Sequence, residues 1–140
     1  MADGRPVLLR VRSVSGDEEL DVRVSGVMRP RGDSLLFTWR ERLAEDDGLS
    51  EETEVSLMVR DGHAVMQRKG PWSVTMVFDP PRERESVYHT PYGDLDVRLR
   101  AHEVRLAANA EDGSLRIVYG IAVQGGPPDR RTLDLEWRHV

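Results

Sequence analysis

The chain has 140 residues, and its 20 lysine and arginine residues are interspersed with 25 aspartate and glutamate residues, which gives a net charge of −5. The absence of cysteine excludes disulfides and thiolate metal sites, and charges of mixed sign exclude the basic surface that a nucleic acid backbone requires. A chain of this length is expected to form one domain over residues 1–140, with a core that needs no cross-links.

The N-terminal segment is polar at the positions where a secretion signal would be apolar. Arg5, Arg10 and Arg12 stand where a signal peptide needs its hydrophobic stretch. No apolar run along the chain approaches the length that crosses a bilayer. We therefore expect a cytoplasmic protein that engages neither a membrane nor a nucleic acid.

Apolar side chains at every second position predict strands through the first half of the chain. Gly26 interrupts the second strand, which predicts a bulge or a sharp bend. The acidic stretch 42–54 is predicted to be a solvated loop or one short helical turn. A metal-binding loop is less favoured, because the stretch lacks the alternating spacing of a calcium loop. Asp61-Gly62 predicts a two-residue hairpin. The strand pattern covers residues 6–14, 20–24, 35–39, 55–59, 63–69 and 73–78.

The second half of the chain is organised around a corner at Pro91-Tyr92-Gly93. A short strand over residues 87–90 leads into it, another begins at Asp94, and Gly93 is predicted to adopt positive φ. Apolar residues then occupy odd positions up to Leu99 and even positions from Val104. One extra residue between them would restore the phase, which predicts a β-bulge. Two more alternating strands follow, over residues 115–123 and 133–137.

About nine or ten short strands joined by tight turns indicate an all-β fold built as an antiparallel meander. An open meander of this size would leave edges exposed, whereas closure into an up-and-down barrel removes them. An immunoglobulin-like sandwich is less favoured, because it needs Greek-key crossovers and nearly all connections here are short. The residues predicted to face the barrel interior are Val7, Leu9, Val22, Phe37, Leu57, Val97, Ile117, Tyr119 and Leu135.

Several short motifs carry a family resemblance. They are Trp39-Arg40-Glu41 with Gly48-Leu49 and Thr53, Arg68-Lys69-Gly70 ahead of residues 74–78, Tyr88-His89-Thr90-Pro91-Tyr92-Gly93, and Gly113-Ser114-Leu115 with Tyr119. The chain resembles, over nearly its whole length, the YwiB-like family of bacterial domains of unknown function. This resemblance implies a calycin-like (lipocalin-like) β-barrel and a cytoplasmic setting, and it implies no activity. The chain departs from the family pattern at Trp39, where tyrosine is expected.

Two charged residues stand at the ends of apolar strand faces. Glu41 and Arg68 would need each other if both pointed into the barrel, since an unpaired buried charge is costly. They either orient a polar ligand head at the barrel mouth or form a structural ion pair. Tyr88 and Tyr119 carry the same ambiguity, because their hydroxyls could face a cavity or bond a backbone carbonyl within a filled core.

The sequence gives less support to the other candidate functional residues. His89 lies near Ser86 and Asp94, but no nucleophile motif frames these residues. The four histidines have no metal-ligand spacing, so no metal, no cofactor and no catalytic residue is predicted. Trp72 is expected at the barrel rim, as an anchor for a protein partner or as a lid.

The sequence therefore favours a non-enzymatic barrel that binds a small apolar or amphipathic ligand. Its predicted ligand-binding residues are Glu41, Arg68, Tyr88 and Tyr119. An arginine favours a carboxylate or phosphate head, so a fatty-acid-like or other amphipathic anion is the first class expected. The alternative is a protein-interaction module with a filled barrel. A third hypothesis is a small hydrolase or isomerase that uses Glu41 or His89.

Overall fold

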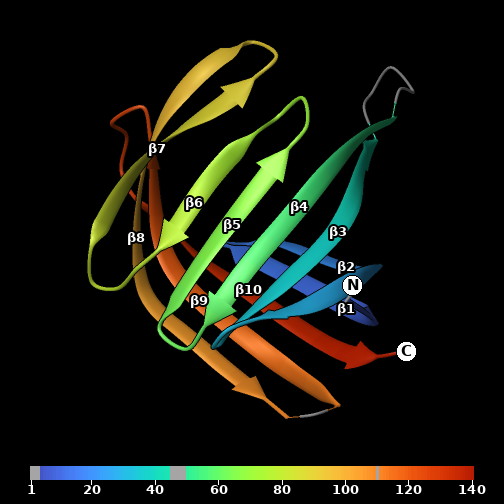
Figure 1. Ribbon diagram of the computed structural model, residues 1–140. Helices are drawn as coiled ribbons and strands as arrows, with labels where there is room; N and C mark the ends of the chain where they lie inside the picture. Colours follow the sequence, from blue (N-terminus) through green and yellow to red (C-terminus); the bar gives the residue numbers. More distant parts are fainter. Residues whose placement is uncertain (1–3, 45–49, 110) are drawn as a thin grey trace.

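Ten antiparallel strands make up the protein in a computed structural model that describes residues 4–44, 50–109 and 111–140 (Figure 1). No helix long and apolar enough to cross a membrane occurs in these ranges. The strands are β1 (Arg5–Ser15), β2 (Glu18–Arg31), β3 (Ser34–Ala44), β4 (Ser50–Arg60), β5 (His63–Lys69), β6 (Val74–Phe78), β7 (Glu83–Thr90), β8 (Gly93–Ala108), β9 (Asp112–Val123) and β10 (Asp129–His139).

The strands follow one another around the barrel in chain order. The ladder runs β6-β5-β4-β3-β2-β1-β10-β9-β8-β7, so sequence neighbours pair and β1 pairs with β10. The two edges, β6 and β7, meet at an isolated bridge between Ser73 and His89. This arrangement is a nearly closed up-and-down barrel, which confirms the predicted fold class.

A second contact fastens the opposite end of the barrel. The turn between β4 and β5 reaches the edge of β8 that extends beyond β7. Gly62 N donates to Val104 O at 3.0 Å, and Leu106 N donates to the Asp61 carboxylate at 3.2 Å. Gly62 has φ +84° at the predicted hairpin, so the Asp61-Gly62 signal was correctly interpreted.

The predicted inward faces form the core. Eight of the nine predicted residues are buried, and Val22 is half-buried against them. Aromatic rings fill the centre: Phe37 packs on Trp137 with centroids 4.7 Å apart, and Phe78 packs on Tyr119 at 5.0 Å.

The two backbone irregularities predicted in the second half are present. The β8–β9 register shifts between Ala101 and Glu103, which leaves His102 as the extra residue of a bulge and restores the inward phase. Gly93 has φ +126° and begins β8 directly after the Pro91-Tyr92 turn.

Three local predictions differ in part from the structure. Of the bulge or sharp bend predicted at Gly26, the bulge is absent, because β2 keeps one register with β1 through the Val7–Gly26 pair. The predicted loop 42–54 is shorter, since β3 continues to Ala44 and β4 begins at Ser50; its centre, residues 45–49, lies outside the described residues. The strand predicted over residues 87–90 already begins at Glu83.

Candidate functional site

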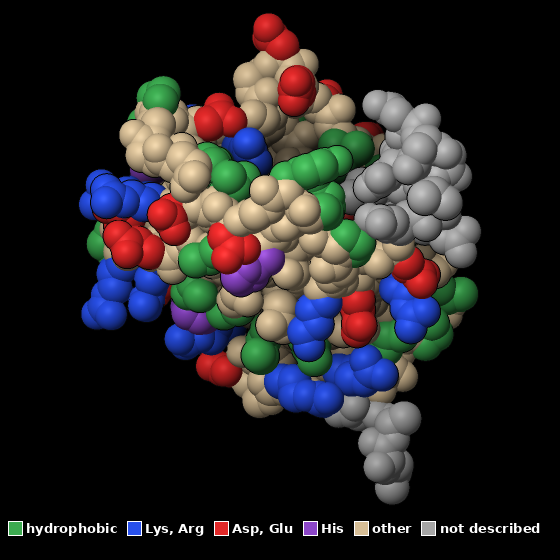
Figure 2. All heavy atoms as spheres, turned by 90° about the horizontal axis from the view of Figure 1, so that it is seen from above, with side chains coloured by type: hydrophobic (Ala, Val, Ile, Leu, Met, Phe, Trp, Pro, Cys, Tyr) green, Lys and Arg blue, Asp and Glu red, His purple; other side chains and the backbone are tan. Residues whose placement is uncertain are grey.

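The four predicted ligand residues come from four strands that run in the same direction. Glu41, Arg68 and Tyr88 lie near the C-terminal ends of β3, β5 and β7, and Tyr119 lies in the second half of β9. Alternate strands of an antiparallel meander are parallel to each other, so these positions approach one end of the barrel. This end is uppermost in Figure 1, and Figure 2 looks down on it, with apolar side chains near the middle and charged ones around them.

Glu41 and Arg68 form an ion pair. Arg68 Nη1 lies 2.6 Å from Glu41 Oε2, and the two side chains are 24% and 14% exposed. The other oxygen of Glu41 accepts a hydrogen bond from the indole nitrogen of Trp39 at 3.0 Å. Trp39 thus supplies a donor at the position where the family resemblance led us to expect a tyrosine hydroxyl.

Tyr119 is buried and lies opposite Arg131 in the β9–β10 ladder. Its side chain is 5% exposed. Burial raises the pKa of Tyr119, while the positive charges of Arg131 and Arg68, together with a hydrogen bond from Arg131, partly offset this rise. The hydroxyl therefore lies within the electrostatic field of both arginines, and Arg131 is the partner of Tyr119 in the β9–β10 ladder.

Tyr88 joins a separate aromatic cluster. It is half-buried, and its ring packs edge-on against Trp72 with centroids 5.9 Å apart. Trp72 in turn meets Tyr92 at 6.3 Å. The ring contact of Tyr88 is thus with Trp72, whereas Glu41 and Arg68 pair with each other and Tyr119 lies opposite Arg131.

Arg131 was missed by the sequence analysis. It lies opposite both Tyr119 and Ser15 in the ladders, and its Nε is 3.2 Å from an Asp129 oxygen that also accepts from Ser15. The alternation does indicate an inward position, because Arg131 continues the odd-numbered inward phase of Leu133 and Leu135. Arg131 was not assigned to the core face because it is charged and lies beside the last loop.

The residues considered for hydrolysis do not assemble around Ser86. His89 Nδ1 lies 2.9 Å from Asp94, and both side chains are more than half exposed. The Ser86 hydroxyl instead donates to the carbonyl of Thr75 at 2.6 Å. Within the described ranges, no cluster of His, Cys, Asp or Glu residues could hold a metal ion.

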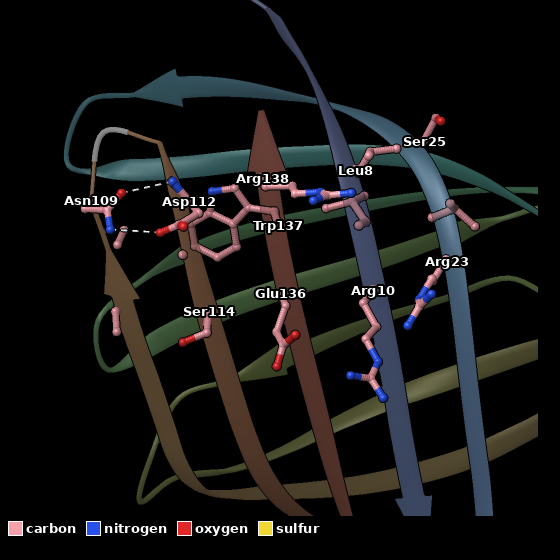
Figure 3. A pocket seen from close by; sticks show the side chains of 15 residues that line it. Leu8, Arg10, Arg23, Ser25, Asn109, Asp112, Ser114, Glu136, Trp137 and Arg138 are labelled. Atoms are coloured by element: carbon pink, nitrogen blue, oxygen red, sulfur yellow. Dashed lines mark hydrogen bonds between the residues drawn. The ribbon is translucent and has the colours of Figure 1, made fainter. Parts of the chain in front are cut away.

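A groove of about 910 Å³ lies on the outer face of β8, β9, β10, β1 and β2 (Figure 3). Arg23 and Arg138 line it, together with Glu136 and the partly exposed Leu8. Arg10 also lines it, but its guanidinium is held by Asp21 through two hydrogen bonds. The groove carries both signs of charge and so defines no single class of ligand.

Fold and site together define an up-and-down β-barrel whose inward polar residues gather at one end. The family model "Domain of unknown function (DUF1934)" matches residues 9–135, and the chain belongs to this family. The crystal structure of the ywiB protein from Bacillus subtilis is similar, with a TM-score of 0.84 at 18% sequence identity over 100% of this chain and 95% of that one. These matches confirm the YwiB-like resemblance. No match was found among the curated proteins.

Proposed function

We propose that the barrel binds a small amphipathic anion at its polar end, with the anionic group held by Arg68. The observation that supports this is that the ion pair occupies both acceptor oxygens of Glu41 but not all the donors of Arg68. Trp39 and Arg68 occupy both oxygens of Glu41, whereas among the described residues Arg68 donates to Glu41 through Nη1 alone. A guanidinium has five N–H donors, so Arg68 retains donors for a second acceptor.

The surroundings fit an amphipathic ligand. A carboxylate or sulfonate accepts two parallel bonds from a guanidinium, and few polar groups in an apolar setting fix orientation. Val55 lies opposite Arg68 in the ladder and Val74 lies on its other side, and both are buried. An apolar tail would contact these side chains, and Tyr119 would lie near the head group.

A thermal-shift series would test this proposal. Alkyl carboxylates and alkyl sulfonates of increasing length would be compared with alcohols of equal length. A ligand at about 100 times its dissociation constant adds ~2.7 kcal/mol, which should raise the melting temperature by several degrees.

Arg68→Gln should abolish the shift. Arg116→Gln, which breaks the outer-face pair with Asp134, should keep it. If no anion stabilises the protein, or if Arg68→Gln responds as the wild type does, ligand binding at Arg68 is rejected.

A second candidate function is docking of a protein partner, which the 91% exposure of Tyr92 favours. This side chain stands at the tip of the β7–β8 hairpin beside Trp72. A photoreactive amino acid at position 92 should then give a discrete adduct in cells that naturally contain the protein. The same group at exposed Val140 is the control, and equal labelling at both positions would argue against this function.

A further inference from the structure

The barrel has one seam without a ladder in the described part of the chain. The nine other neighbouring strand pairs, including β1–β10, form ladders, and among the described residues only the β8–β9 ladder is interrupted, by the bulge at His102. Between β6 and β7 there is only the Ser73–His89 bridge, with backbone hydrogen bonds of 2.9 and 2.8 Å. This seam is the weakest part of the barrel wall in backbone hydrogen bonding.

The middle of the seam has main-chain groups without backbone partners across it. Ser73 bonds His89, so alternation along β6 turns the N–H and C=O of Thr75 and Val77 toward β7 as well. No backbone bond from Thr75 or Val77 to β7 is formed in the described structure. The hydroxyl of Ser86 bonds the Thr75 carbonyl instead.

Both ends of the seam are fastened. At one end the Ser73–His89 bridge is flanked by Trp72, whose ring meets those of Tyr88 and Tyr92. At the other end Asp79 accepts from Arg84 at 2.6 Å. The seam is therefore held at its two ends and open to rearrangement between them.

A concavity of about 330 Å³ lies over this seam and reaches Arg68. Its lining includes Arg68 and Lys69, which is the only lysine of the chain, and no acidic residue. In a protein with a net charge of −5, a concavity without acidic lining is a local site that favours anions.

We infer that the amphipathic anion reaches Arg68 by passing between β6 and β7, and that Trp72 controls the opening. This inference rests on the proposed function. Lys69 attracts the anionic group to the seam, and the apolar part follows past Thr75 and Val87. The opening requires no ladder to break, since in the described part of the chain the Ser86–Thr75 bond is the only hydrogen bond across the middle of the seam.

The test closes the seam with a covalent bond. Continuing the Ser73–His89 register places Thr75 opposite Val87, so Thr75→Cys/Val87→Cys introduces the only two cysteines of the chain. They are joined by oxidation or by a short bis-alkylating reagent, and joining is verified by mass. Val14→Cys/Thr132→Cys is the matched control, because this pair lies in the continuous β1–β10 ladder.

The probe is 8-anilinonaphthalene-1-sulfonate, an amphipathic anion that fluoresces on binding. Its association rate, measured by stopped flow, should fall at least tenfold in the joined seam variant and recover when an oxidised seam is reduced. The joined control should bind at the wild-type rate. Trp72→Ala should raise association and dissociation rates several-fold together, with little change in affinity.

The possible results distinguish failure of the seam inference from failure of the proposed function. An unchanged rate in the joined seam variant overturns the inference and places access elsewhere than between β6 and β7, while leaving binding at Arg68 intact. Binding that does not depend on Arg68, tested with Arg68→Gln, rejects the proposed function and the inference with it.

Discussion

Arg68 and Glu41 meet across an intervening strand. β4 lies between their strands, with Thr53 opposite Glu41 and Val55 opposite Arg68 in the ladders. The ion pair thus runs diagonally over Thr53 and Val55, which are 3% and 0% exposed. It ties β3 to β5 on the inner face without any backbone contact between the two strands.

Removing one partner of this pair should destabilise the protein. Arg68→Gln or Glu41→Gln leaves a largely buried charged group without its partner, which should lower the free energy of unfolding by about 1–3 kcal/mol. The double variant removes both charges and should lose less than the sum of the two single losses. Denaturant unfolding of the four proteins measures the coupling, and purely additive losses would contradict it.

Gly26 offers a test of close packing between strands. A Cβ at this position would lie 2.6 Å from the carbonyl oxygen of Thr38 and 2.7 Å from Leu9 Cδ1. Because a backbone atom cannot move aside cheaply, Gly26→Ala should cost about 1–3 kcal/mol. Gly120→Ala adds the same methyl group 3.8 Å from its nearest neighbour, His102 Nε2, and should be nearly neutral. Equal unfolding free energies for the two variants would refute this packing argument.

The bulge at His102 and the close packing at Gly26 show what sequence patterns can and cannot reveal. Alternation placed the core correctly, and the phase slip predicted a bulge between Leu99 and Val104, which the structure places at His102, because a two-residue period fixes which face is buried. Gly26 was misread because a glycine that permits close approach looks the same as one that permits a bulge. The distinction depends on Thr38 and Leu9, which are distant in sequence.

The candidate site was predictable only in part. Glu41 and Arg68 interrupt apolar faces, so their pairing followed from the cost of burying charge. The β9–β10 register places Arg131 opposite Tyr119, whereas the ring of Tyr88 contacts Trp72 across the seam, and the alternation of apolar residues specifies neither neighbour. The β6–β7 seam left no sequence signal, because residues 74–78 alternate as a fully paired strand would.

The φ of Gly93 makes a substitution there costly. At φ +126° an alanine is strained although no heavy atom lies within 4 Å of the added Cβ. Gly93→Ala should cost about 1–3 kcal/mol and lower the melting temperature by several degrees. Gly93→Asn should not rescue stability, since asparagine tolerates only the left-handed helical region. Gly16 has φ +58°, so Gly16→Asn is the control and should melt close to the wild type.

The stability that Asp79 contributes at the Arg84 end of the seam should be lost in acid. The hydrogen bond from Arg84 holds the pKa of Asp79 below its ordinary value. A lowered folded-state pKa contributes stability above the unfolded-state pKa, and this stability is lost as the pH falls through the folded-state value. Asp79→Asn should therefore destabilise the protein at neutral pH, and its deficit should shrink below about pH 4.

Melting temperatures between pH 2.5 and pH 7 would measure the deficit caused by Asp79→Asn. Asp17→Asn is the control, because Asp17 forms no ion pair in the described structure. A deficit for Asp79→Asn that stays constant across this range would show that the carboxylate charge is not its source.

Tyr119 should make stability fall in alkali. Burial raises the pKa of its hydroxyl above the ordinary value, so above about pH 10 the unfolded chain loses this proton before the folded protein does. The unfolded state then binds fewer protons, and the free energy of unfolding decreases as the pH rises.

Tyr119→Phe removes the titrating group and should flatten this decrease. Tyr92→Phe removes a hydroxyl from a side chain that is 91% exposed and should keep the wild-type slope. Urea unfolding at intervals from pH 8 to pH 11 measures the slopes, and an unaltered slope in Tyr119→Phe would show that the Tyr119 hydroxyl does not titrate against burial.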